Sequence, residues 1–171
     1  MLQPFQGDRA LRIAVLTVSD TRNEQTDKGG PLVQELALAA GLEIGAYEIR
    51  KDDTTAIREV LAEWLQREDL DAVVTTGGTG IANRDVTIEA VRPMLQKELD
   101  GFGELFRFLS YAEDIGTKAL LSRALGGTAA EKAIFVLPGS TGAVRLAMER
   151  LILPEIHHIM KELTKHRQPR V

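Results

Sequence analysis

Residues 75–80 read TTGGTG and end the apolar run Asp71–Thr76, a pattern typical of a buried strand that opens into a glycine-rich turn. Glycine costs roughly 0.5–1 kcal/mol in regular structure, so the glycines at Gly77–Gly80 favour a sharp bend or a backbone that lies close to a ligand. Arg84 and Asp85 follow, where a helix is expected to begin. The stretch therefore predicts a phosphate-binding strand-to-helix turn. A tight turn without a ligand is the alternative, because an isolated glycine motif is weak evidence.

Strand and helix patterns alternate on the amino-terminal side of this turn. A strand buried on both faces is predicted at Leu11–Val18, a short β-branched run, and a second strand at Leu42–Arg50, where the residues alternate. A helix opened by Pro31 and closed by Gly41 separates them, and a second helical stripe runs over residues 57–65. This order predicts parallel strands joined by right-handed crossovers, with helices on both faces of the sheet.

The carboxyl-terminal half adds further elements. Helices are predicted at Val86–Leu95, where Pro93 limits the length, and at Gly101–Ser110, whose Phe102, Phe106 and Leu109 share one face and are expected in the core. Two strands, 122–125 and 132–137, are predicted to pair antiparallel around a turn at residues 126–127, and Ser140 is expected to cap the last helix. The fold expected is a three-layer α/β/α domain over residues 1–171, with a mostly parallel sheet and one antiparallel pair.

Composition narrows the class of protein. The chain has 171 residues, 44% of them hydrophobic, and no cysteine, which excludes disulfides and thiolate chemistry and suits a reducing cytoplasm. The net charge of −4 argues against a broad nucleic-acid surface, and no apolar stretch approaches the ~20 residues of a membrane span. These features predict a soluble cytoplasmic protein without a nucleic-acid or membrane partner.

Three polar clusters are expected to meet at one edge of the sheet. Ser19 and Asp20, residues 50–53, and Thr76–Gly80 each follow a predicted strand. Ligands of open α/β sheets bind beyond the carboxyl ends of the strands. The convergence of the three clusters makes a shared site more credible than any single motif does.

Asp52 and Asp85 are the candidate chemical groups of this edge. A carboxylate beside a phosphate is repelled unless a divalent cation or a proton transfer uses it, and Mg²⁺ combines carboxylate with nucleotide phosphate oxygens. The alternative is a solvated Asp52 and an Asp85 that favours the positive end of its own helix. For Asp53 we expect only a helix cap.

Other catalytic classes are disfavoured. His157 and His158 are adjacent on a predicted helix and point about 100° apart, which does not suit a shared metal ion. The Gly-x-Ser-x-Gly elbow, the P-loop and the dinucleotide fingerprint after the first strand are all missing.

From Ile13 to about Met148 the sequence resembles the MoaB/MogA family of molybdopterin-binding proteins, which includes the gephyrin G domain. The matching segments are 18–20, 75–80, 84–87, 101–104, 122–123 and 137–140, and the length and residues 106–116 look more like the MoaB branch.

The resemblance implies an α/β/α fold that assembles as a trimer or hexamer, molybdopterin as the bound substrate, and transfer of AMP from Mg²⁺-ATP to its terminal phosphate. It implies that Asp52 and Asp85 are catalytic and hold Mg²⁺. The residues implied to bind substrate or phosphate are Ser19, Asp20, Thr76, Gly77, Gly78, Thr79, Gly80, Arg84, Ser110, Pro138, Gly139 and Ser140.

One position departs from the family pattern. Active adenylyltransferases that this chain resembles usually have proline after Asp-Val-Thr, and here Ile88 stands there, whereas Arg84 and Asp85 are kept. The function expected is molybdopterin adenylyl transfer. The alternatives are a carrier that binds molybdopterin without catalysis and a structural oligomer whose glycine turn holds no ligand.

Overall fold

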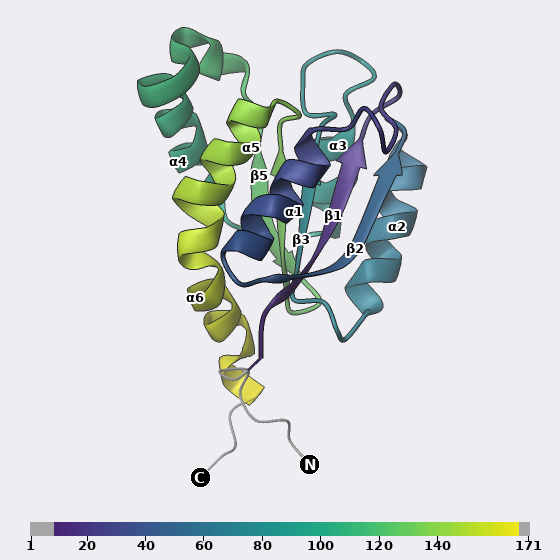
Figure 1. Cartoon of the computed structure of the whole chain (residues 1–171), viewed down its shortest axis with the longest axis vertical. Coiled ribbons are helices and arrows are strands. Elements are labelled where there is room, and N and C mark those ends of the chain that lie inside the picture. The colour runs from purple at the N-terminus through teal and green to yellow at the C-terminus, as the bar shows by residue number, and fades with distance from the viewer. Residues whose placement is uncertain (1–8, 168–171) are drawn as a thin grey trace.

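The computed structural model describes residues 9–167, which form a six-stranded mixed sheet of order β2-β1-β3-β6-β5-β4 (Figure 1). The strands β2, β1, β3 and β6 run parallel, β5 pairs antiparallel with β6, and β4 pairs antiparallel with β5. The strand bounds are β1 Arg12–Val18, β2 Glu43–Arg50, β3 Ala72–Thr76, β4 Lys97–Glu98, β5 Leu125–Ala129 and β6 Lys132–Leu137.

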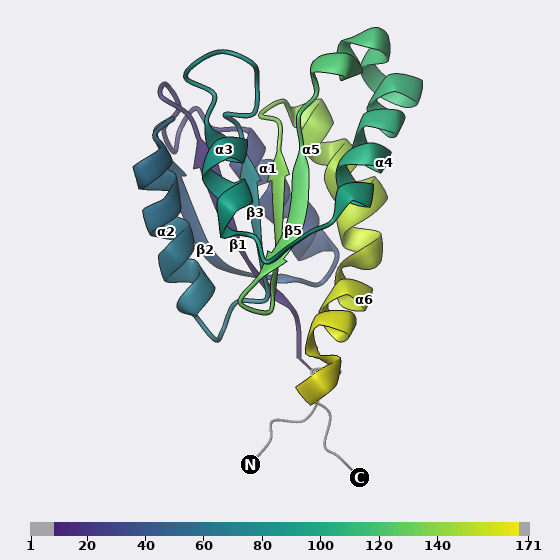
Figure 2. The same cartoon turned by 180° about the vertical axis from the view of Figure 1, so that it is seen from behind.

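Helices cover both faces of the sheet, as Figures 1 and 2 show. One core cluster packs α1, α4, α5 and α6 on one face, and a second packs α2 and α3 on the other. The predicted three-layer α/β/α architecture is therefore confirmed. The helix bounds are α1 Gly29–Ala39, α2 Thr54–Gln66, α3 Thr87–Val91, α4 Asp100–Ser110, α5 Thr141–Ala147 and α6 Leu153–Thr164.

The central strand β1 shows why the sheet is buried on both faces. Its Ile13 and Val15 belong to the first core cluster, whereas Ala14, Leu16 and Val18 belong to the second. Side chains alternate across a strand, so an uninterrupted apolar run supplies both cores.

The antiparallel hairpin differs from its prediction. Residues 126 and 127 lie inside β5, and the turn is made by Ala130 and Glu131, which have φ values of 49° and 58°. A Cβ at Gly126 would lie 2.9 Å from the Phe102 Cβ, and one at Gly127 would lie 2.5 Å from a Leu95 methyl carbon. These glycines therefore serve close packing of the strand rather than a turn.

Other elements differ in detail. The helix expected over Val86–Leu95 is the short α3 followed by a 3₁₀ turn, Arg92–Met94, that contains the proline. Leu109 is half-buried and not in the core, whereas Phe102 and Phe106 are buried there as predicted. The strand β4 was not predicted, and a π-helical turn, Met148–Ile152, joins α5 to α6.

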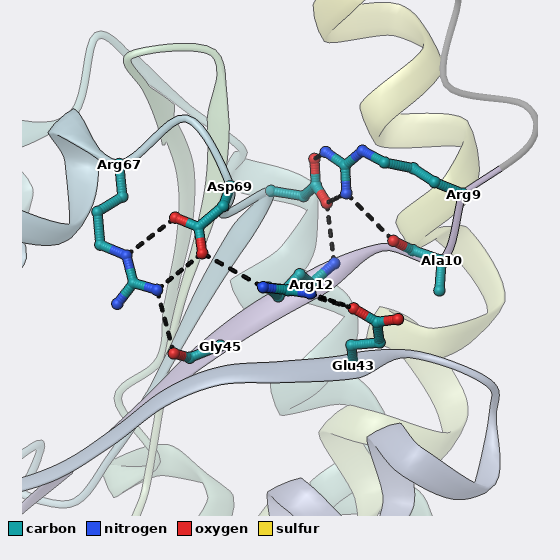
Figure 3. A network of polar contacts seen from close by, with 8 residues as sticks. Arg9, Ala10, Arg12, Glu43, Gly45, Arg67 and Asp69 are labelled. Carbon is teal, nitrogen blue, oxygen red and sulfur yellow. Dashed lines mark hydrogen bonds and ion pairs between the residues drawn. The ribbon is translucent and has the colours of Figure 1, made fainter.

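Ion pairs join the amino-terminal ends of the strands (Figure 3). The Arg9 guanidinium donates to both carboxylate oxygens of Asp71 at 2.8 and 2.9 Å, and the Arg12 amide donates to the same carboxylate at 2.8 Å. Arg12 also pairs with Glu43, and Arg67 with Asp69. Each of these carboxylates has a cationic partner.

Among residues 9–167, no helix has the length and apolar character needed to cross a membrane. The predicted cytoplasmic location stays a prediction. Residues 1–8 and 168–171 of the predicted single domain lie outside the described residues.

Candidate functional site

A cavity of about 690 Å³ lies at the carboxyl ends of the parallel strands. It brings together most of the site residues predicted from the sequence, which come from the loops after β1, β2, β3 and β6. The predicted residues that line it are Ser19, Asp52, Thr76, Gly77, Gly78, Thr79, Gly80, Arg84, Asp85, Pro138, Gly139 and Ser140. Asp20 is hydrogen-bonded to Asp52 but does not line the cavity, and neither does Ser110, which is buried in α4.

The glycine turn after β3 has a backbone that other residues adopt only with strain. Gly77 and Gly78 have φ values of 97° and 68°, and a Cβ at Gly77 would lie 2.3 Å from the Val18 carbonyl oxygen. The Gly77 amide donates to the Leu137 carbonyl at 2.9 Å, and the Thr87 hydroxyl donates to the Gly77 carbonyl at 2.9 Å. The neighbouring sheet and the start of α3 thus hold the turn in place.

The amides of this turn are left free. Within residues 9–167, the N–H groups of Gly78, Thr79 and Gly80 have no hydrogen-bond acceptor from the protein. Successive unpaired N–H groups at a strand-to-helix turn are the donors that an anion accepts.

Asp20 and Asp52 hold each other by a reciprocal pair of hydrogen bonds. The Asp20 amide donates to Asp52 Oδ2 at 3.1 Å, and the Asp52 amide donates to Asp20 Oδ1 at 3.0 Å. The other oxygen, Asp52 Oδ1, is buried without a hydrogen-bond partner and lies 2.8 Å from where a Cβ of Gly78 would be. Asp52 therefore presents an unsatisfied acceptor beside the glycine turn.

Asp85 lies at the other end of the same turn. Its Oδ2 accepts a hydrogen bond from the Ala82 amide at 3.1 Å and lies 2.6 Å from where a Cβ of Gly80 would be. Burial raises the pKa of Asp52, the charges of Asp20 and Asp85 raise it further, and Arg84 opposes them. The charge of Asp85 therefore acts on Asp52 across the turn.

The donor set suits a hard divalent cation shared with a ligand. Asp52 and Asp85 offer carboxylate oxygens, and Asp52 Oδ1 has no protein partner. No group of three or more His, Cys, Asp or Glu residues that could hold a metal ion occurs in the part of the chain that the structure describes. Mg²⁺ bound by one or two carboxylates and completed by substrate phosphates and water fits this arrangement.

The cavity also contains three basic residues that were not among the predicted site residues, namely Arg22, Lys28 and Arg123. Arg123 donates to the Gly80 carbonyl at 2.9 Å and forms an ion pair with Glu89 on α3. It therefore buttresses the turn that carries the free amides. Two signals in the sequence were available. Arg123 lies in the matching segment 122–123, and Lys28 precedes a pair of glycines.

A buried carboxylate supports the wall formed by the start of α1. Asp27 accepts hydrogen bonds from the Thr17 hydroxyl at 2.6 Å, from the Gly30 amide at 3.3 Å and from the Tyr47 hydroxyl. Burial raises the pKa of the Tyr47 phenol, and the hydrogen bond to Asp27 adds to the effect. The network ties α1 to β1 and β2 beside the cavity.

The turn after β6 completes the cavity. The Thr76 hydroxyl donates to the Pro138 carbonyl at 3.0 Å, which joins this turn to the end of β3. Ser140 caps α5, as predicted, by accepting a hydrogen bond from the Ala143 amide at 3.2 Å.

Comparison with known proteins identifies relatives over most of the chain. Residues 14–158 match the family model described as a probable molybdopterin binding domain. Molybdenum cofactor biosynthesis protein B of Staphylococcus carnosus is 62% identical over 160 residues, which cover 92% of this chain and 94% of the relative. A crystal structure of a molybdenum cofactor biosynthesis protein B superposes with a TM-score of 0.90 at 55% identity, over 95% of this chain and all of the other. The tungsten cofactor synthesizing protein MoaB of Pyrococcus furiosus superposes with a TM-score of 0.81 at 40% identity, covering 91% of this chain and 98% of the other.

Proposed function

We propose that the chain transfers AMP from ATP to the terminal phosphate of molybdopterin and releases pyrophosphate. The chain belongs to the family of molybdopterin-binding domain proteins that includes MoaB. One observation carries the proposal. Two carboxylates, Asp52 and Asp85, stand at the two ends of a glycine turn whose amides are free to donate, all within one cavity.

The chemistry joins two anions. An oxygen of the molybdopterin phosphate attacks the α-phosphorus of ATP, a P–O bond forms, and the bond to the β-phosphate oxygen breaks as pyrophosphate leaves. Charge repulsion and alignment are the main barriers to such a transfer. The free amides of Gly78–Gly80 and the Arg84 cation would lower the repulsion, and their rigid placement would align the groups.

The reaction needs no strong base from the protein. The attacking phosphate is already ionised near neutral pH, so no proton has to be removed from it. The described residues that line the cavity include neither histidine nor cysteine, which suits this chemistry.

Asp52 and Asp85 are the residues that would hold Mg²⁺. When bound with ATP, the cation neutralises charge on the phosphates. Asp20 would position Asp52 for this role through their reciprocal hydrogen bonds.

The test is an AMP-transfer assay with purified protein, molybdopterin, ATP and Mg²⁺. We expect pyrophosphate release by the unaltered chain, its loss in Asp85→Asn, and its retention in the control Asp100→Asn, which changes an exposed residue outside the cavity. Tight molybdopterin binding without AMP transfer would identify a carrier instead. Absence of binding to both molybdopterin and ATP would leave a structural oligomer.

Self-association, as a trimer or hexamer, is a second part of the proposal. The segment from α4 to residue 121 exposes large apolar side chains, with Leu105 at 53%, Phe108 at 64% and Leu120 at 88% exposure. Exposed apolar groups gathered on one segment are typical of subunit interfaces. We expect light scattering to give a mass of three or six chains, and Phe108→Asp to reduce it.

A further inference from the structure

The basic residues of the cavity differ in how they are used by the protein. Arg123 is paired with Glu89, and the Arg22 guanidinium donates to the Thr26 carbonyl at 3.0 Å. Within residues 9–167, the side chains of Lys28 and Arg84 have neither an ion-pair nor a hydrogen-bond partner, yet both line the cavity. These two cations are therefore available to a ligand.

The two available cations come from opposite faces of the sheet. Arg84 belongs to the loop before α3 and is close enough to Asp52 to lower its pKa. Lys28 directly precedes α1, which covers the other face together with α5. Arg84 is therefore available to a ligand in the half of the cavity that contains the two carboxylates. Lys28 is available in the half formed by α1 and the turn before α5.

The backbone that carries Lys28 is held on both sides. Asp27, which precedes it, is buried and accepts three hydrogen bonds. Gly29, which follows it, packs so closely that a Cβ there would lie 3.1 Å from the Thr76 hydroxyl and 3.4 Å from the Gly139 carbonyl oxygen. The Lys28 side chain is exposed, but the backbone that carries it is fixed beside the turn at residues 138–140.

We propose that Lys28 is the cationic residue of a second phosphate subsite, on the side of α1 and the turn at residues 138–140, which takes the phosphate group that the glycine turn does not hold. The ligand named here, a phosphate of either ATP or molybdopterin, rests on the proposed function. Two phosphate-bearing substrates need two places for their phosphates, and the protein offers an unpaired cation at each half of the cavity.

The test measures binding of Mg²⁺-ATP and of molybdopterin separately by calorimetry over a series of salt concentrations. We expect Lys28→Met to weaken one ligand about tenfold at low salt and to reduce the salt dependence of its binding, because one charge-assisted contact is lost. The other ligand should change less than twofold. Lys28→Arg should restore most of the affinity, and the control Lys97→Met, on the distant strand β4, should change neither ligand.

Unchanged affinity for both ligands in Lys28→Met would overturn the subsite, as would an equal loss for both or a wild-type chain that binds neither. The two proposals fail separately. If the wild-type chain transfers no AMP but Lys28→Met still weakens one ligand selectively, the adenylyl-transfer function falls and the subsite stands.

Discussion

The two ends of the sheet each carry a charged cavity, and the two cavities differ in how their arginines are paired. The cavity at the amino-terminal ends is the larger, about 860 Å³, and its three arginines, Arg9, Arg12 and Arg167, each have a carboxylate partner. The cavity at the carboxyl ends is smaller, but it leaves three amides, Asp52 Oδ1 and two cations without partners among the described residues. Size does not mark the candidate site here. The candidate site is distinguished by three successive free amides beside the unpaired Asp52 Oδ1, whereas the larger cavity also contains Lys132 without a partner among the described residues. A folded protein leaves polar groups unpaired at a cost that ligand binding can offset.

The largest expected effect is on catalysis at the carboxyl edge. Asp52→Asn should lower the rate of AMP transfer by about a hundredfold to a thousandfold, since it removes charge that the transition state needs. The fold should survive, because the asparagine oxygen can still accept from the Asp20 amide. Steady-state assays beside urea unfolding would measure both. A large fall in the urea midpoint of Asp52→Asn would contradict the claim that Asp52 serves catalysis and not stability.

The opposite pattern is expected for Asp71 at the amino edge. Its side chain is 3% exposed and takes both Arg9 hydrogen bonds and the Arg12 amide. Asp71→Asn should reduce the free energy of unfolding by about 2–3 kcal/mol, because a buried carboxylate that is paired and hydrogen-bonded is lost. AMP transfer by the folded variant should stay within twofold of wild type. Asp69→Asn, at an exposed pair on the same edge, serves as the control and should change stability far less.

A smaller effect is expected where the fold meets the site. Thr87→Val keeps the shape of a fully buried side chain but removes the hydroxyl that donates to the Gly77 carbonyl. We expect a loss of about 1 kcal/mol in the free energy of unfolding and a lower affinity for ATP, since the glycine turn loses one of its supports. Chemical unfolding and calorimetry would show both losses. Stability lost with affinity fully retained would mean that the turn is held without Thr87.

The smallest effect expected is on the pH dependence of stability, and its sign should differ between the edges. The pKa of Asp52 is raised, so the folded state binds its proton more tightly, and stability relative to Asp52→Asn should fall as pH rises above the ordinary aspartate value. Arg67 lowers the pKa of Asp69 to about 2, so stability relative to Asp69→Asn should be present near pH 4 and be lost toward pH 2. Thermal unfolding of the two variants without Mg²⁺ from pH 2 to 7 would compare the slopes. Slopes of the same sign would remove the electrostatic contrast.

Much of the parallel half of the fold could be predicted because its signals are local. β1 and β3 are apolar runs, β2 alternates between apolar and polar residues, and each of the three ends at a polar cluster that parallel topology brings to one edge. The helix caps at Asp53 and Ser140 were equally local, since each side chain accepts from an amide three residues ahead. The glycines of β5 were misread because the reason for them, contact with Phe102 and Leu95, lies far away in the sequence.

The sequence predicted which residues belong to the candidate site better than it predicted which of their polar groups are paired. The resemblance to the MoaB/MogA family and the strand ends named Asp52, Asp85 and the glycine turn. Neither revealed that Asp20 and Asp52 clamp each other across 32 positions, or that Asp52 Oδ1 is left without a partner. Lys28 was overlooked because a lysine in a polar loop carries no periodic signal.

Local patterns in the sequence were enough to predict the α/β/α fold and the edge of the sheet that carries the candidate site, because hydrophobic runs and turn residues act over short distances. Which polar groups are paired and which are free follows from the folded structure. That distinction separates the amino edge, where Asp71 is satisfied by arginine, from the carboxyl edge, where Asp52 and the amides of Gly78–Gly80 are not. Pairing depends on atoms that segments distant in the chain bring together, and local sequence patterns do not record it.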